Sequence, residues 1–261
     1  MRRVQKALCV LVFTSVLIGS CVARADDVSL TSVIDKAAYQ RMLSQRVVKL
    51  YCQIGLGVIP EASRVQLAEA IKIYEQNLQD VGGHVNDLRS QKLIEDITLQ
   101  WGLVRVMLSS LPVRGDAENL MVRSDALLKA AEGLTEHLQK FSGDPSLSLV
   151  KLSGRQRMLS QRLAKYYMLR EWGVAAAQVN DSIELAGKEF SDALNDLLKS
   201  QENSPEVQEE LEVVRSQWDV LQMALSQKKD FANHRVVADA SDSILQHMDH
   251  VTQLYVELAQ R

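Results

Sequence analysis

A seven-residue sequence occurs twice in this chain. QRMLSQR occupies residues 40–46 and returns unchanged at residues 156–162. The match continues outside the motif at an offset of 116 residues, and beyond residue 100 at an offset of 117, as a one-residue insertion in a loop would produce. Equivalent pairs include Lys49 and Lys165, Tyr51 and Tyr167, Trp101 and Trp218, Ser124-Asp125 and Ser241-Asp242. The chain is therefore predicted to contain two copies of a unit of about 115 residues, a period typical of a domain rather than a solenoid repeat.

The composition favours helices. The 261 residues include only 12 Gly and 4 Pro, and 46% are hydrophobic, while no segment alternates with period two for long enough to predict a strand. Glycine and proline clusters divide each copy into four amphipathic segments, which is the pattern of an antiparallel four-helix bundle. The predicted helices cover residues 30–57, 61–81, 90–111 and 117–141 in the first copy, and 147–172, 175–200, 205–227 and 234–261 in the second.

The N-terminus has the pattern of an export signal. Arg2, Arg3 and Lys6 precede an apolar run at residues 7–20, and Ala23-Arg24-Ala25 forms a small-x-small cleavage site. We expect a signal peptide at residues 1–25 and a periplasmic mature protein. Two alternatives stay open. Residues 18–21 resemble a lipobox, in which Cys21 would carry lipid, and the leader could remain as an uncleaved anchor.

Export leaves an acidic chain with one cysteine. Cys9 and Cys21 lie in the leader, so Cys52 alone remains after cleavage and no internal disulfide is possible. Without the four basic leader residues, 26 basic residues face 33 acidic ones, a net charge of −7. An acidic surface repels nucleic acid and anionic lipid, so neither partner is expected.

Helical spacing gives the repeated motif two faces. At about 100° per residue, Leu43, Val47 and Leu50 fall on one side and form the apolar stripe that a bundle core requires. Small or uncharged side chains surround Arg41 on another side, and the same division recurs around Arg157. Because small side chains let helix backbones approach closely, we expect the two first helices to pack against each other about a pseudo-twofold axis. The fold class predicted is all-α, a tandem repeat of two antiparallel four-helix bundles, residues 26–143 and 144–261, packed through their first helices.

This packing would bring Arg41 and Arg157 together from opposite sides. Two facing guanidiniums repel each other unless a negative group lies between them, and neither heptapeptide contains Asp or Glu. A small planar anion held by two bidentate guanidiniums would meet this requirement. The alternative is structural: carboxylates from other helices could neutralise each arginine.

The motif also carries a family resemblance. Residues 154–162, GRQRMLSQR, resemble the signature of the type IV pilus chemotaxis transducer N-terminal (PilJ-like) domain, which is related to NarX-like nitrate sensors. The resemblance covers both copies and implies a periplasmic four-helix bundle that binds nitrate between paired arginines, here Arg41 and Arg157. The two sides differ: Ala37-Ala38 in the first copy stands where the second has Ser153-Gly154, and Tyr39 stands where the second has Arg155.

The prediction is therefore an exported protein that binds or senses a small oxyanion, nitrate or nitrite. Since the family's receptors continue into a transmembrane helix and signalling modules, a separate membrane receptor or kinase is expected as partner. No cofactor is expected, and no enzyme activity, because no acid-base pair or activated nucleophile can be assembled. The competing interpretation is a ligand-free helical scaffold or interaction protein of the cell envelope. The predicted ligand-binding residues are Arg41, Arg157, Gln45, Gln161, Ser44, Ser160 and Gly154.

Other recurring residues have simpler interpretations. The glutamines and serines of the motif could equally make the helix interface polar. Arg46 and Arg162 point away from the first arginines and are expected to pair with acids at the bundle edge. Trp101 and Trp218 are expected in the core. His247 and His250 could begin a metal site, but they do not recur in the first copy, and a solvated pair is preferred.

Overall fold

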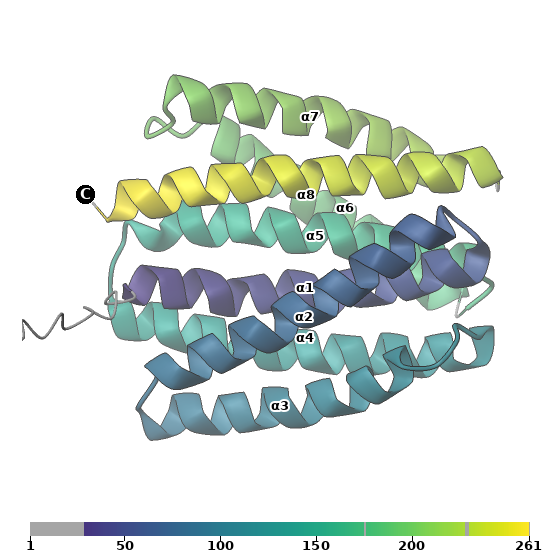
Figure 1. The fold of residues 1–261 in the computed structure, drawn as a ribbon. Helices are drawn as coiled ribbons and strands as arrows, with labels where there is room; N and C mark the ends of the chain where they lie inside the picture. Colours follow the sequence, from purple (N-terminus) through teal and green to yellow (C-terminus); the bar gives the residue numbers. More distant parts are fainter. Residues whose placement is uncertain (1–28, 175, 228–229, 261) are drawn as a thin grey trace, which may run out of the picture.

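The computed structural model describes residues 29–174, 176–227 and 230–260. Within these ranges every regular element is an α-helix and there is no strand, which confirms the all-α prediction. The predicted signal peptide, including Cys21, lies outside the described residues. The described helices are α1 (Leu30–Leu56), α2 (Pro60–His84), α3 (Leu88–Leu108), α4 (Arg114–Ser142), α5 (Leu147–Glu171), α6 (Ala176–Leu198), α7 (Pro205–Ser226) and α8 (Phe231–Ala259) (Figure 1). None of them combines the length and apolar character needed to cross a membrane.

Local sequence signals set most helix ends. Helix α7 begins with Pro205 in its first turn, and the Ser204 side chain accepts a hydrogen bond from the backbone N–H of Val207. Helix α1 ends at Leu56, and the left-handed conformation of Gly57 (φ 74°) caps its last turn. The expected stop at residues 82–83 is wrong, because α2 continues through both glycines to His84. A glycine costs a helix only about 1 kcal/mol, and burial of the neighbouring Val81 opposes that cost.

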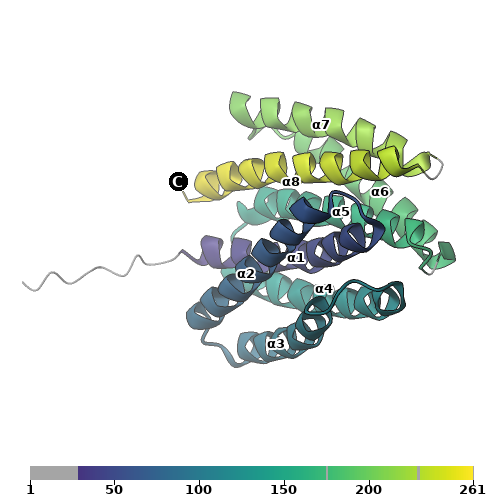
Figure 2. The ribbon, with the colours of Figure 1, turned by 45° about the vertical axis from the view of Figure 1, so that its right-hand side comes forward.

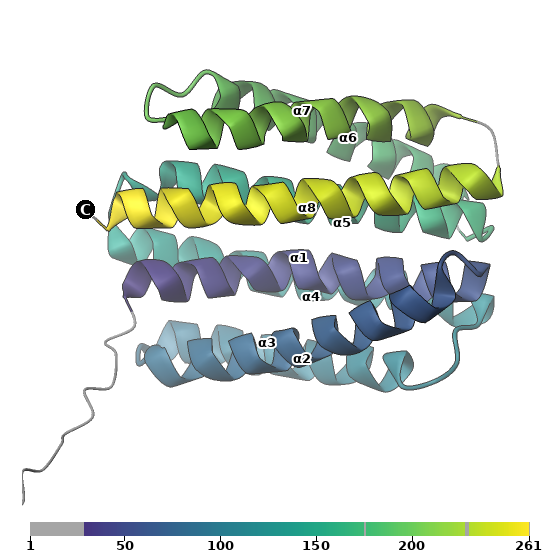
Figure 3. The same ribbon diagram turned by 45° about the horizontal axis from the view of Figure 1, so that its top comes forward.

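The helices form four layers of two (Figure 3). In the first half of the chain, α1 packs against α2 and α4, and α3 packs against α4. In the second half, α5 packs against α6 and α8, and α7 packs against α8. Figure 2 shows the halves one above the other, and the most extensive contact between any two helices joins α1 to α5. We call this contact the seam.

Helices α1 and α5 run in the same direction and in matching register (Figure 1). The Cβ of Ala38 lies 3.9 Å from the position that a Cβ on Gly154, its equivalent at offset 116, would occupy. Near the other end of the seam, the Trp172 ring lies directly on Gly55, 2.2 Å from the position of a missing Cβ. Both contacts join residues that lie 116 or 117 positions apart in the sequence.

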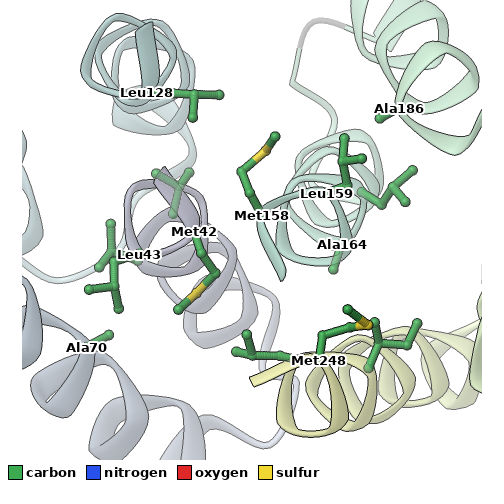
Figure 4. Close-up of a cluster of buried hydrophobic side chains, with 14 of the residues drawn as sticks. Met42, Leu43, Ala70, Leu128, Met158, Leu159, Ala164, Ala186 and Met248 are labelled. Atoms are coloured by element: carbon green, nitrogen blue, oxygen red, sulfur yellow. The ribbon is translucent and has the colours of Figure 1, made fainter. Parts of the chain in front are cut away.

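Apolar side chains fill the space on either side of the seam. Figure 4 shows Met42 of α1 and Met158 of α5 pointing to opposite sides, Met42 toward the side of Met248 in α8 and Met158 toward the side of Leu128 in α4. Farther out, Trp101 stacks on Tyr74 with ring centroids 3.8 Å apart. The equivalent pair, Trp218 and Phe190, has centroids 4.4 Å apart. Both tryptophans are buried, as expected.

Candidate functional site: the arginine seam

The seam brings Arg41 and Arg157 together beside Gly154. A Cβ on Gly154 would lie 3.3 Å from Nη2 of Arg157 and 3.6 Å from Nη2 of Arg41. Both arginines are buried: the exposed fraction of Arg41 is 1% and that of Arg157 is 2%. Because glycine has no side chain, it leaves the two Nη2 atoms room to approach one point from α1 and α5.

Each arginine is paired with a carboxylate from the last helix of its own half. Nη1 of Arg41 lies 3.0 Å from Oε1 of Glu132 in α4. Nη1 of Arg157 lies 3.1 Å from Oδ1 of Asp249 in α8. Glu132 and Asp249 are 117 residues apart and therefore equivalent. Carboxylates from other helices therefore reach both arginines, which is the structural alternative that the sequence left open, and an external anion is not required to pair either of them.

A third carboxylate breaks the symmetry. Asp35 of α1 accepts a hydrogen bond from Nη2 of Arg157 across the seam. The residue equivalent to Asp35 in the second half is Lys151, which is exposed. Nη2 of Arg41 correspondingly has no hydrogen-bond partner among the described residues. Three carboxylates thus surround two guanidiniums, and among the described residues one buried donor is left over on each arginine, Nη2 of Arg41 and Nε of Arg157.

The electrostatics of the two arginines differ for the same reason. Burial lowers the pKa of Arg41, Glu132 opposes this effect, and the nearby charge of Arg157 adds to it. Burial also acts to lower the pKa of Arg157, but Asp35 and Asp249 outweigh it and the net shift is upward. Burial raises the pKa of Asp249 despite its partner Arg157. Arg41 is therefore the less neutralised of the two cations.

Tyr39 adds to the asymmetry. Its hydroxyl donates to Oδ2 of Asp249 over 3.2 Å, and its ring lies under the Arg157 guanidinium at 5.0 Å from the centroid. Burial and the neighbouring Asp249 raise the pKa of the Tyr39 hydroxyl, so it remains a neutral donor. The equivalent residue, Arg155, pairs instead with Glu189 of α6.

The serines and glutamines of the motif bond to the protein itself. Ser44 donates to the backbone carbonyl of Arg41 (2.7 Å), and Ser160 donates to that of Arg157 (2.9 Å). The side-chain amide of Gln45 donates to Ser44, and that of Gln161 donates to the backbone of Ser241 (2.8 Å). These bonds of Ser44, Ser160 and Gln45 each lie within one helix, and the bond of Gln161 joins α5 to α8. A direct role of these four residues in ligand binding stays a prediction.

Two buried lysines form a second layer of the seam. Nζ of Lys49 in α1 lies 2.7 Å from Oδ1 of Asp242 in α8. Nζ of Lys165 in α5 lies 2.6 Å from Oδ1 of Asp125 in α4. Each bond joins one half of the chain to the other, and both lysine side chains are fully buried. These pairs were not predicted from the sequence, although all four residues recur at offsets of 116 or 117 and could have been matched. Burial lowers the pKa of Lys49 to about 8.

The remaining polar candidates lie away from the arginine pair. Arg46 pairs with Asp242, as expected for a residue at the bundle edge. His247 and His250 are not merely solvated, since both contact Glu210 of α7 and His250 also contacts Glu206. Across the described ranges, no cluster of three or more His, Cys, Asp or Glu residues is arranged to hold a metal ion.

Two equivalent grooves reach the carboxylates of the seam. The first, of about 360 Å³, lies between α1, α2 and α8, and Tyr39, Arg46, Asp242 and Asp249 are among its lining residues. The second, of about 470 Å³, includes Asp125, Glu132 and Arg162. Asp249 lines the first groove and Glu132 lines the second, and each is paired with a buried arginine.

Buried ion pairs therefore join α1 to α5 and α8, and α5 to α4, in a chain whose described elements are all helices. Residues 144–258 match the family model described as "Type IV pili methyl-accepting chemotaxis transducer N-term" (PilJ). The matched segment contains α5 to α8 and the second arginine of the seam, so the second half of the chain is PilJ-like. The family is sensory and non-enzymatic, which confirms the prediction that the chain is not an enzyme. Comparisons with curated proteins and with solved structures gave no significant match.

Proposed function

We propose that this protein is a sensory domain that binds a small planar oxyanion, nitrate or nitrite, at the seam between Arg41 and Arg157. The observation that carries the proposal is the buried Nη2 of Arg41, which finds no acceptor in the part of the chain that the structure describes and faces Nη2 of Arg157 across Gly154. An unsatisfied buried donor on a charged group costs more than about 1–3 kcal/mol. An anion that accepts from both Nη2 atoms would remove that cost.

The ligand must be small. Nη2 of Arg157 and Nη2 of Arg41 lie only 3.3 and 3.6 Å from the position of a missing Cβ on Gly154, so a three-atom or four-atom planar anion fits the proposal better than a bulky one. Planarity matches the coplanar donors of a guanidinium. The grooves that reach Asp249 and Glu132 are the proposed routes of entry.

Titration calorimetry tests this function. Nitrate, nitrite and sulfate are titrated into the wild-type protein and into the variants Arg41→Ala and Arg157→Ala. We expect saturable binding of nitrate or nitrite at one site per chain, and its loss in both variants. The matched control is Arg105→Ala, which removes an exposed arginine that pairs with Glu75 away from the seam. Binding that survives in Arg41→Ala would refute the proposed site.

A second candidate is a ligand-free scaffold, and the ion pairs of the seam favour it. Glu132, Asp249 and Asp35 supply three negative charges to two arginines. Such a network can hold two helices in register without any ligand. The absence of binding to every oxyanion, together with a large loss of stability in Arg157→Ala, would favour this function over sensing.

The organisation of the whole chain follows from the repeat. We propose that residues 26–143 and 144–261 are tandem antiparallel four-helix units of the PilJ-like type, related to NarX-like sensors, and that the seam takes the place of a dimer interface. The support is the offset of 116 to 117 residues, which relates the Lys49–Asp242 pair to the Lys165–Asp125 pair. We further propose export through the signal at residues 1–25, a periplasmic location and signalling through a separate membrane receptor or kinase. Mass spectrometry of the exported protein would distinguish cleavage after Ala25 from lipid attachment at Cys21.

A further inference from the structure

Asp35 is the one carboxylate at the arginine pair with no acidic equivalent in the other half of the chain. Glu132 and Asp249 occupy equivalent positions, whereas Asp35 corresponds to Lys151. Asp35 also comes from the opposite half to its partner: it lies on α1 and contacts Arg157 of α5. The repeat alone therefore does not account for this ion pair.

The position of Asp35 matters because of the atom it contacts. It accepts from Nη2 of Arg157, the same nitrogen that faces Nη2 of Arg41 beside Gly154. A carboxylate is a planar oxyanion with two acceptor atoms, as nitrite is, and forms the same hydrogen bonds with a guanidinium. Asp35 thus holds one of the two donors that an external oxyanion would need.

We infer that Asp35 is a built-in competitor for the oxyanion, and that its exchange with the ligand on Nη2 of Arg157 sets the affinity and selectivity of the site. This inference rests on the proposed function. Asp35 is suited to exchange because 22% of its side chain is exposed, so water can solvate the carboxylate once it leaves Arg157. Arg157 cannot follow it, because Asp249 retains Nη1.

The competition favours anions that can replace a carboxylate. Nitrate, nitrite and formate are planar and offer acceptors to both Nη2 atoms, as the Asp35 carboxylate does to one of them, whereas sulfate is tetrahedral. A hydrogen bond to a charged group contributes about 1.5–3 kcal/mol. Removing the competing carboxylate should therefore raise oxyanion affinity about 10- to 100-fold.

The test compares calorimetric dissociation constants for nitrate, nitrite and formate in wild type, Asp35→Asn, Asp35→Ala and Asp35→Glu. We expect binding about 10- to 100-fold tighter in the Asn and Ala variants than in wild type, and near-wild-type affinity in the Glu variant, which keeps the carboxylate. Asp80→Asn is the matched control, since Asp80 forms an exposed ion pair with Lys36 in the same half. Circular dichroism and urea unfolding establish that each variant is folded. If Asp35→Ala does not fold, the comparison is made with Asp35→Asn alone.

The outcomes separate this inference from the proposed function. If wild type, Asp35→Asn and Asp35→Ala bind nitrate or nitrite equally well, Asp35 is no competitor, and the oxyanion site itself stands. If neither wild type nor any Asp35 variant binds nitrate, nitrite or formate, the inference and the proposed function both fail. Tighter binding in Asp80→Asn as well would show a general effect of charge and would also overturn the role of Asp35.

Discussion

Asp35 of α1 forms an ion pair with Arg157 of α5 across the contact between the two halves of the chain. The equivalent pairing in the other direction is not possible, because Lys151 stands where a second aspartate would be required. The two arginines of the repeated heptapeptide therefore have unequal surroundings where they meet. Arg157 has two carboxylates and an unpaired Nε, whereas Arg41 has one carboxylate and an unpaired Nη2 among the described residues.

The unequal pairing predicts unequal stability effects. Arg157→Ala leaves Asp35 and Asp249 without their cation, whereas Arg41→Ala leaves only Glu132. Removing the cation of a buried ion pair strongly destabilises the folded state, because the carboxylate that remains is an uncompensated charge. We expect Arg157→Ala to lower the free energy of unfolding by about 3 kcal/mol and Arg41→Ala by about half as much. Urea denaturation measures both, and equal losses would contradict the asymmetry.

Gly154 is predicted to matter more for oxyanion binding than for the free energy of unfolding. A Cβ at this position would crowd both Nη2 atoms, the nearer at 3.3 Å, so Gly154→Ala should weaken nitrate binding about tenfold or more. Stability should change little, because alanine favours the helix by about 1 kcal/mol and offsets the crowding. Gly102→Ala is the control, since its Cβ would meet nothing within 4 Å. Calorimetry and urea unfolding of both variants separate the two effects, and unchanged nitrate binding in Gly154→Ala would contradict the site.

The far end of the seam depends on close packing between Gly55 and Trp172. A Cβ on Gly55 would lie 2.2 Å from ring atoms of Trp172, so Gly55→Ala should cost about 1–3 kcal/mol of unfolding free energy. In a Trp172→Ala background the clash is gone, and the same substitution should stabilise the helix by about 0.5–1 kcal/mol. A double-mutant cycle measures this reversal of sign. A Gly55→Ala effect that is the same in both backgrounds would show that the ring does not pack there.

Because Lys49 is buried, we expect the free energy of unfolding to depend on pH. Its folded-state pKa of about 8 lies below the ordinary 10.5 because the side chain is buried. Between pH 8 and pH 10.5 the unfolded state binds more protons than the folded state, so the contribution of Lys49 to the free energy of unfolding rises with pH. The cost of burying the charged lysine is fully present below pH 8. Relative to Lys49→Met, wild type should gain about 1–3 kcal/mol between pH 7 and pH 10. Urea unfolding at both pH values measures the gain, and a parallel response of the two proteins would contradict it.

The repeat made much of this architecture predictable. Identical heptapeptides with one apolar face and one small-residue face pointed to contact between the first helices, and the structure places α1 against α5. Helix ends were less predictable where glycine is tolerated, as at residues 82–83, because packing of the whole helix outweighs a local preference.

The carboxylates of the seam show where sequence reasoning stops. Glu132 and Asp249 recur at the offset of the repeat and could have been matched to the arginines as equivalent pairs. Asp35 could not, because its contact depends on the register of two helices from different halves and has no equivalent to support it. Long-range pairs of this kind are set by tertiary packing rather than by local pattern.

The most direct test is a crystal structure of the protein grown with saturating nitrate. The account predicts a planar anion within hydrogen-bond distance of Nη2 of Arg41 and Nη2 of Arg157, with the Asp35 carboxylate turned away from Arg157. An intact Asp35–Arg157 ion pair with no anion beside Gly154 would contradict the account.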